Sequence, residues 1–247
     1  MDDASPDEVR LPADRSRQPS LVVRIEDELP SWLRPVDGEG RLLVSASVLV
    51  VAAMQLLLPG RFVLVPQQWV LPMLELVLLL TLTVINPVRL TRETTAARYL
   101  SLLLVAVLSA DNGASAVLLD AKLIRGTAGS GAGPLLAAAA AIYLTNIIAF
   151  AIWYWEFDRG GPFARARADS RYPDFLFPQM TQAHLARPDW RPEYADYLFV
   201  SLTNATAFSP TDTLPLTRWA KLLMSAQSIV ALSTVALVIA RAINILR

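Results

Sequence analysis

The residue types most able to do chemistry gather in one short stretch near the C-terminal end of the chain. Between positions 206 and 212, three hydroxyl groups and one carboxylate fall within seven residues. Oxygen atoms of this kind can replace part of the water around a cation. The stretch is therefore the first candidate site, and its residues are Thr206, Ala207, Phe208, Ser209, Pro210, Thr211 and Asp212.

Two further candidates are carboxylates inside apolar stretches. Glu75 lies between Trp69 and Asn86, and Asp111 lies between Tyr99 and Ile124. A carboxylate inside a membrane is costly unless it is paired or faces water, so each is a functional candidate. For Glu75, the alternative is a position near enough to the interface to reach headgroup water.

The sequence offers little for enzymatic or metal chemistry. It has no cysteine and one histidine, His184, so it lacks thiolate ligands, cysteine nucleophiles and a histidine pair. No nucleophile and base can be placed together. Basic and acidic residues number 22 each, which leaves no basic surface for nucleic acid. We expect no enzymatic activity, no metal, no cofactor and no nucleic-acid partner.

The composition is that of a protein with several spanning helices. Of 247 residues, 54% are hydrophobic, and the mean hydropathy is +0.41. We expect an all-α integral membrane protein of the cell membrane with about five transmembrane helices. The apolar stretches that predict them cover residues 42–58, 69–86, 99–124, 135–155 and 219–246.

The third apolar stretch contains a turn signal. Asp111, Asn112 and Gly113 follow one another near its middle, and such a run favours a turn. The helix could break there in mid-membrane, as in transporters and re-entrant segments. Alternatively, Asp111 is a buried charge in an unbroken helix.

The chain from Ser201 to Leu222 resembles the pore loop and inner helix of the tetrameric potassium-channel superfamily. An aromatic segment at 193–200 precedes it and a long apolar helix follows it, which is the family's order of pore helix, filter and inner helix. The resemblance implies a re-entrant pore helix and loop before the last helix. It also implies a homotetramer in the lipid bilayer, with monovalent cations as possible ligands. The matching positions are Ser201, Ala205, Thr206, Asp212, Pro215, Thr217, Trp219, Lys221 (for Arg) and Leu222.

The filter itself departs from the family pattern. Both filter glycines are absent, because residues 207–211 read Ala-Phe-Ser-Pro-Thr where the family has Thr-Val-Gly-Tyr-Gly. A carbonyl ladder needs backbone conformations that glycine allows and that proline and threonine resist. We therefore expect weak cation selectivity or a pore closed at rest, with Phe208 as a possible constriction. The tryptophan that clamps the filter aspartate in the family is missing, because Phe199 and Val200 occupy that region.

A polar stripe marks the last helix. Its members follow a spacing of three or four residues, which places them on one face of a helix. In the channel interpretation this face lines the conduction path, and in the alternative it contacts other helices. The predicted pore-lining residues are Gln227, Ala231, Thr234 and Val238.

These observations divide the chain into three parts. Residues 1–40 form a flexible polar segment, residues 41–133 the N-terminal transmembrane helices, and residues 134–247 a channel-like pore domain. We expect a homotetrameric cation channel of weak or altered selectivity. Two alternatives stay open: a non-conducting structural or regulatory relative of channels, and a small transporter that uses Glu75 and Asp111.

The orientation in the membrane is not settled by the sequence. Five spans with a cytoplasmic N-terminus place the arginine-rich 157–192 loop inside the cell, as the positive-inside rule favours. The family enters its pore loop from outside. Either the stretch at 99–124 turns back, or the pore is inverted.

Overall fold

The computed structural model describes residues 29–57, 67, 69–87, 89–90, 94–127, 132–206 and 212–245. Within these ranges the chain is mostly helical, and one two-stranded antiparallel sheet is present. The elements in chain order are η2 (Ser31–Leu33), α2 (Leu42–Leu57), α3 (Val70–Ile85), α4 (Thr95–Ile124), α5 (Ala132–Phe157), η4 (Asp158–Gly160), α6 (Pro162–Ala166), β1 (Phe175–Leu176), α7 (Pro178–Thr181), η5 (Ala183–Leu185), α8 (Tyr194–Thr206), β2 (Leu214–Pro215) and α9 (Arg218–Ile245).

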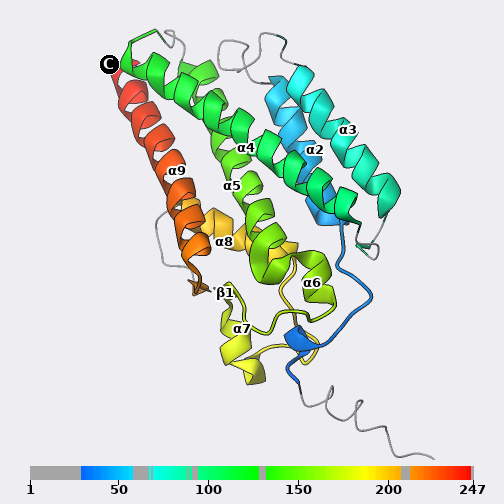
Figure 1. Ribbon diagram of the computed structural model, residues 1–247. Coiled ribbons are helices and arrows are strands. Elements are labelled where there is room, and N and C mark those ends of the chain that lie inside the picture. The colour runs from blue at the N-terminus through cyan, green and yellow to red at the C-terminus, as the bar shows by residue number, and fades with distance from the viewer. Residues whose placement is uncertain are drawn as a thin grey trace, which may run out of the picture.

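The long helices form a bundle. α2, α3, α4, α5 and α9 pack side by side, and the short α8 packs against α5 and α9 near one end (Figure 1). α6, α7 and β1 lie beyond that end, which we call the loop end (Figure 1). The C-terminal end of α9 lies at the opposite end, which we call the far end.

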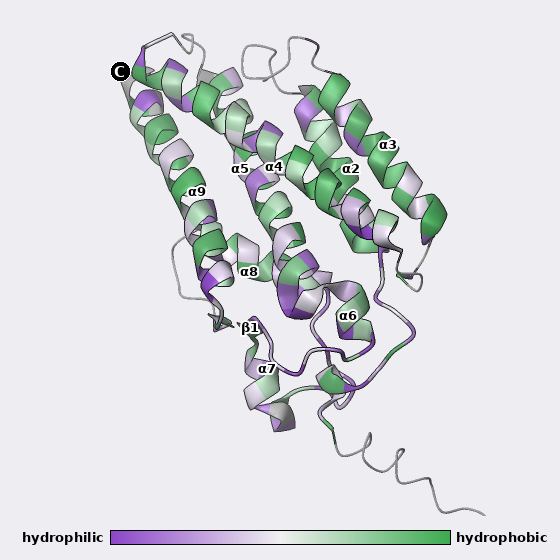
Figure 2. Ribbon diagram, viewed as in Figure 1, coloured by the Kyte–Doolittle hydropathy of each residue, from purple (hydrophilic) through white to green (hydrophobic). Residues whose placement is uncertain are grey.

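Three of the helices are long and apolar enough to cross a membrane. The spanning stretches are Thr95–Ile124, Gly133–Gly160 and Arg218–Arg241. These helices support the expected integral membrane protein, and apolar residues run along them in Figure 2. α2 and α3 have 16 residues each, or about 24 Å at 1.5 Å per residue, which is shorter than the roughly 30 Å hydrocarbon core. Three of the five predicted spans therefore correspond to helices long and apolar enough to cross a membrane, and the total of five is not confirmed.

α4 is unbroken through its turn signal. It runs for 30 residues from its N-cap, where the Thr94 side chain accepts a hydrogen bond from the Ala97 amide at 3.1 Å. Asp111, Asn112 and Gly113 all lie inside it. A break here would free backbone groups that find no water among packed helices, so the helix overrides the local preference for a turn. Of the two interpretations of this stretch, the unbroken helix holds.

The N-terminal segment is anchored from residue 29 onward. The Val36 amide donates to the Ala166 carbonyl at 2.8 Å, and Gly40 pairs with Arg89 in a β-bridge. These contacts bring residues 29–41, the α3–α4 connection and the loop after α5 to the same end of the bundle. Residues 1–28, which make up most of the predicted flexible segment, lie outside the described residues.

The short helix before α9 is longer than the sequence indicates. α8 continues to Thr206, whereas a strand-like loop is expected from Ser201. The Ser201 hydroxyl donates to the Ile147 carbonyl of α5 at 2.6 Å, so this side chain fixes α8 against α5. The expectation of a loop beginning at Ser201 is wrong because the hydroxyls here serve helix packing rather than a loop.

A pair of glycine substitutions tests the unbroken α4. A Cβ at Gly113 would meet nothing within 4 Å, and replacing a helical glycine by alanine adds about 0.5–1 kcal/mol of stability. We expect Gly113→Ala to raise the midpoint of thermal unfolding in detergent. Gly161→Ala is the contrasting variant, because Gly161 has φ +99° and its Cβ would overlap the Arg98 guanidinium. It should lower the midpoint, and a lowered midpoint for Gly113→Ala would contradict a continuous helix.

Candidate functional site

Most of the predicted filter lies outside the described residues. Ala207, Phe208, Ser209, Pro210 and Thr211 belong to the part that the structure does not describe. At its borders, Thr206 ends α8 and its hydroxyl donates to the Thr203 carbonyl at 3.0 Å, and Asp212 is exposed. The role of this loop therefore stays a prediction.

The stripe on α9 faces the interior of the chain. Gln227 accepts a hydrogen bond from the Tyr154 hydroxyl and donates to the Ser201 carbonyl at 2.9 Å. The outward face of α9 is apolar and includes the exposed side chains of Leu222 and Ile229. Polar groups are more stable against other helices than against lipid. None of the four predicted pore-lining residues is more than 4% exposed: Gln227, Ala231, Thr234 and Val238. This corrects the pore-lining prediction in favour of contact with neighbouring helices.

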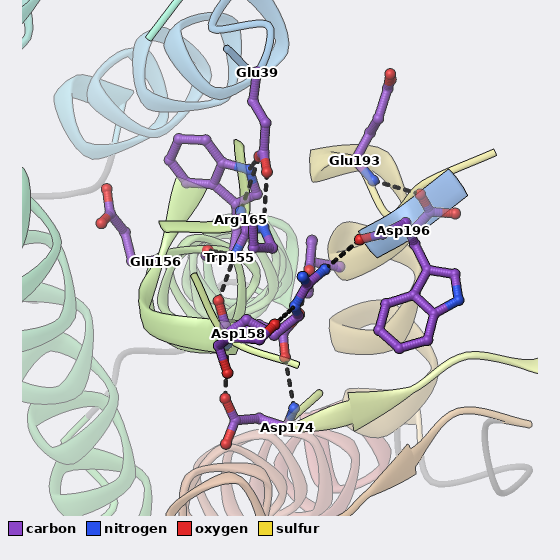
Figure 3. A network of polar contacts seen from close by, with 12 residues as sticks. Glu39, Trp155, Glu156, Asp158, Arg165, Asp174, Glu193 and Asp196 are labelled. Atoms are coloured by element: carbon purple, nitrogen blue, oxygen red, sulfur yellow. Dashed lines mark hydrogen bonds and ion pairs between the residues drawn. The ribbon is translucent and has the colours of Figure 1, made fainter. Parts of the chain in front are cut away.

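A network of charged and polar groups closes the loop end (Figure 3). Its centre is Asp158, which follows α5 and is fully buried. One carboxylate oxygen accepts hydrogen bonds from the amides of Asp174 and Phe175, at 2.8 and 3.2 Å. The other accepts a hydrogen bond from the Tyr197 hydroxyl at 2.6 Å. This carboxylate therefore joins α5, β1 and α8.

Arg165 on α6 extends the network to the N-terminal segment. Its Nε and Nη2 atoms donate to the Glu39 carboxylate at 2.7 and 2.8 Å. Its Nη1 atom donates to the carbonyls of Trp155 and Asp158, which lie where α5 ends and helical acceptors lack partners. Burial alone would lower the pKa of Arg165, but the charge of Glu39 raises it above the usual value, so the guanidinium stays charged.

The remaining acidic groups of the network also have partners. Glu156 is held by Arg98 at 2.8 Å and by the Ser101 hydroxyl. The Trp219 indole of α9 donates to Asp174 at 2.9 Å. Because the buried charges of Glu156, Asp158 and Arg165 all have partners, the network acts as a structural clasp at the end of the bundle.

A second set of polar residues lies at one level inside the bundle. From the Ser101–Glu156 contact, Asn112 is eleven residues along α4 and Asn146 is ten residues back along α5. Both are therefore about 15–17 Å above the contact at 1.5 Å per residue. The hydrogen bond between Tyr154 and Gln227 places two threonines in the same way. Thr145 lies nine residues back along α5 from Tyr154, and Thr234 lies seven residues along α9 from Gln227.

The two predicted carboxylates come together beside these residues. The Gln55 side chain of α2 donates to Glu75 of α3 at 2.9 Å. Asp111 of α4 lies near enough to Glu75 to interact with it electrostatically. Glu75 is fully buried, so the alternative that it reaches headgroup water does not hold for the described chain. We call the whole set the polar layer: Gln55, Glu75, Asp111, Asn112, Ser115, Thr145, Asn146 and Thr234.

Seven of the eight residues of the polar layer carry a buried polar atom without a hydrogen-bond partner among the described residues. Eight such atoms lie in the layer, against single atoms of residues such as Trp32 and Arg159 at the loop end. Leaving one such group unsatisfied costs about 1–3 kcal/mol, so eight of them at one level require an explanation. The atoms are Glu75 Oε2, Asp111 Oδ1, Asn112 Oδ1, Ser115 Oγ, Thr145 Oγ1, Asn146 Oδ1, Asn146 Nδ2 and Thr234 Oγ1.

Apolar clusters lie on both sides of the polar layer. Toward the loop end, α4 contributes Leu104 and Leu108 to one core cluster. Toward the far end, it contributes Ala116 and Leu119 to another, which also contains Val238 of α9. The part of the layer on α4, α5 and α9 thus lies between two apolar packings. No group of three or more His, Cys, Asp or Glu side chains suited to a metal ion occurs among the described residues.

Comparison of the chain with protein-family models, with curated proteins and with solved structures finds no match. The arrangement of the side chains is therefore the basis for any proposal about function.

Sequence reasoning found part of the polar layer. Glu75 and Asp111 stand out as carboxylates in apolar stretches, and Thr234 belongs to the α9 stripe. The neutral members Gln55, Asn112, Ser115, Thr145 and Asn146 were missed as site residues. For Asn112, Thr145 and Asn146 the signal was a pair of adjacent polar residues in an otherwise apolar helix, as in the Thr145–Asn146 pair between Leu144 and Ile147.

Two arginines two residues apart test the clasp. Arg165→Ala leaves the largely buried Glu39 carboxylate, whose side chain is 10% exposed, without its ion-pair partner, and breaking a buried ion pair costs about 3–5 kcal/mol. We expect a marked fall in the thermal unfolding midpoint in detergent. The matched control is Arg167→Ala, because Arg167 forms a half-exposed pair with Asp169 worth about 1 kcal/mol or less. Equal effects of the two variants would contradict the assignment of the clasp.

Proposed function

We propose that this protein transports a small monovalent cation across the membrane through its own helix bundle, with the polar layer as the binding site. The observation that carries the proposal is the set of eight unpartnered buried polar atoms at one level of the bundle. Seven of them are oxygens, the atoms that coordinate such cations. Two of these oxygens belong to the carboxylates of Glu75 and Asp111.

The composition of the layer favours a monovalent cation. Two carboxylates are surrounded by neutral amide and hydroxyl oxygens, whereas protein sites for divalent cations draw on more acidic ligands and a higher charge. Ionised carboxylates buried together repel each other, so a bound cation or a proton stabilises the pair. Glu75 and Asp111 are thus able to exchange a proton for the transported ion.

The apolar clusters on either side favour a transporter over an open channel. They separate the α4, α5 and α9 part of the polar layer from both ends of the bundle, which is expected for an occluded site that opens to one side at a time. Basic side chains gather at the loop end, which the positive-inside rule assigns to the cytoplasm. In the described chain they include Arg34, Arg41, Arg89, Arg98, Arg159, Arg165, Arg167, Arg171, Arg187, Arg191, Arg218 and Lys221.

A tetrameric pore-loop channel is the second candidate, and one observation favours it. α5, α8 and α9 form a unit in which a short helix packs against two long ones, the order that the resemblance implies. The loop after α8 leads to β2, which pairs with β1 at the loop end, so the pore would be inverted. Its lining would have to come from the apolar outer face of α9, since the polar face is buried.

Ion uptake by reconstituted protein tests the proposal. The full chain in liposomes should take up rubidium or sodium tracer, and Asp111→Asn and Glu75→Gln should each slow uptake. Losing a charge-assisted contact worth about 1.5–3 kcal/mol lowers the affinity for the ion by about tenfold or more. Asp212→Asn is the matched control, because it removes a carboxylate from the pore-loop stretch and leaves the bundle intact.

The outcomes separate the candidates. Uptake that depends on Asp111 and Glu75 but not on Asp212 supports transport through the bundle. Uptake lost in Asp212→Asn and retained in the other two variants overturns it in favour of the pore-loop channel. An absence of uptake for rubidium, sodium and protons in the folded wild-type protein would contradict both, and would leave the non-conducting structural role.

A further inference from the structure

A cavity at the loop end has no part in the proposed transport site. It has a volume of about 630 Å³ and lies between the start of α2, the residue-89 connection, the loop before α8 and the first turn of α8. Ligand pockets in proteins commonly have about 300–1,000 Å³, so this cavity has the size for a small organic group.

Positively and negatively charged side chains that form no ion pair within the described part of the chain line the cavity. Arg89, Arg187 and Arg191 line it, and none forms an ion pair within the described part of the chain. Asp189 and Glu193 line it as well, and both are exposed. A ligand that carries only negative charge would meet the arginines but also these two carboxylates.

The other two acidic residues that line the cavity are already engaged. Glu39 is bound by Arg165 in the clasp, and Asp196 accepts a hydrogen bond from the Glu193 amide at 2.8 Å. The remaining lining charges therefore suit a zwitterion with one anionic and one cationic group. Arginine side chains bind phosphate in a bidentate manner, and carboxylates accept hydrogen bonds from an ammonium group.

The position of the cavity points to a lipid. Leu42 and Leu43 open α2 and line the cavity, and 70% and 56% of these residues are exposed. They stand where the apolar helix begins, next to the charged groups of the loop end. Acyl chains would lie along these leucines while the headgroup enters the cavity, which matches the boundary between hydrocarbon and headgroups.

We propose that this cavity binds the headgroup of a zwitterionic phospholipid with a primary ammonium group, of the phosphatidylethanolamine class. The arginines take the phosphate, Asp189 and Glu193 take the ammonium, and Leu42 and Leu43 contact the acyl chains. The site does not depend on the transport proposal, because it shares no residue with the polar layer.

Native mass spectrometry of the full chain tests this proposal. Protein is exchanged from micelles that contain phosphatidylethanolamine, phosphatidylglycerol or both, and the retained lipid is measured. We expect the double variant Arg187→Gln/Arg191→Gln to reduce retained phosphatidylethanolamine by about tenfold. The matched control is Arg171→Gln, which removes an exposed arginine between α6 and β1 that does not line the cavity.

A second double variant tests the ammonium contact. Asp189→Asn/Glu193→Gln should weaken phosphatidylethanolamine retention and strengthen that of phosphatidylglycerol, since only the cationic half of the site remains. Preferential retention of phosphatidylglycerol by the wild-type protein would overturn the zwitterion assignment. Full displacement of the lipid by equimolar soluble phosphoethanolamine would show that the site takes a free phosphate compound and would overturn the lipid. Unchanged retention in Arg187→Gln/Arg191→Gln, with the protein folded, would overturn the site.

Discussion

The buried charge of Arg165 holds the loop end of this bundle together. One guanidinium binds Glu39 of the N-terminal segment and the carbonyls of Trp155 and Asp158 at the end of α5. Because α5 packs against α4, α8 and α9, the position of its end fixes where the other helices end. Asp158 completes the arrangement through β1 and α8. A charge buried at this depth is stable only when its donors are used, and this requirement determines the path of the chain from η2 to β1.

The same requirement separates structure from function in this molecule. At the loop end, buried carboxylates and guanidinium groups have partners, and the result is a clasp. In the middle of the bundle, Asp111, Asn146 and their neighbours present oxygen and nitrogen atoms without partners among the described residues. Both sets are buried and polar, and they differ in whether their hydrogen-bonding capacity is used. Unused hydrogen-bonding capacity at one level of the bundle is the feature on which the proposed binding of a cation rests.

The sequence predicted the long helices well, because an apolar stretch of sufficient length has one stable form in a bilayer. It could not predict the clasp, since Glu39, Asp158 and Arg165 sit in polar segments where charges are ordinary and their pairing depends on the fold. The turn signal at residues 111–113 left both a broken and an unbroken helix open for a related reason. The local preference for a turn takes no account of the neighbouring helices. Their packing leaves the backbone groups at a break without hydrogen-bond partners. The direction of the α9 stripe was equally undetermined, because water and neighbouring helices both accept a polar face.

The direction of that stripe also links the resemblance to the structure. The Ser201–Gln227 contact uses two positions that the channel interpretation assigns to the start of the pore loop and to the pore lining. In this chain they bind each other, so α8 and α9 are locked by the polar groups that a central pore would need. A chain can therefore keep the element order of a pore domain while turning its polar face inward. Once that face is inside, the buried polar groups lie among α3, α4, α5 and α9 of one chain, and in the proposed transport the carboxylates of Glu75 and Asp111 are the charges that an ion would meet.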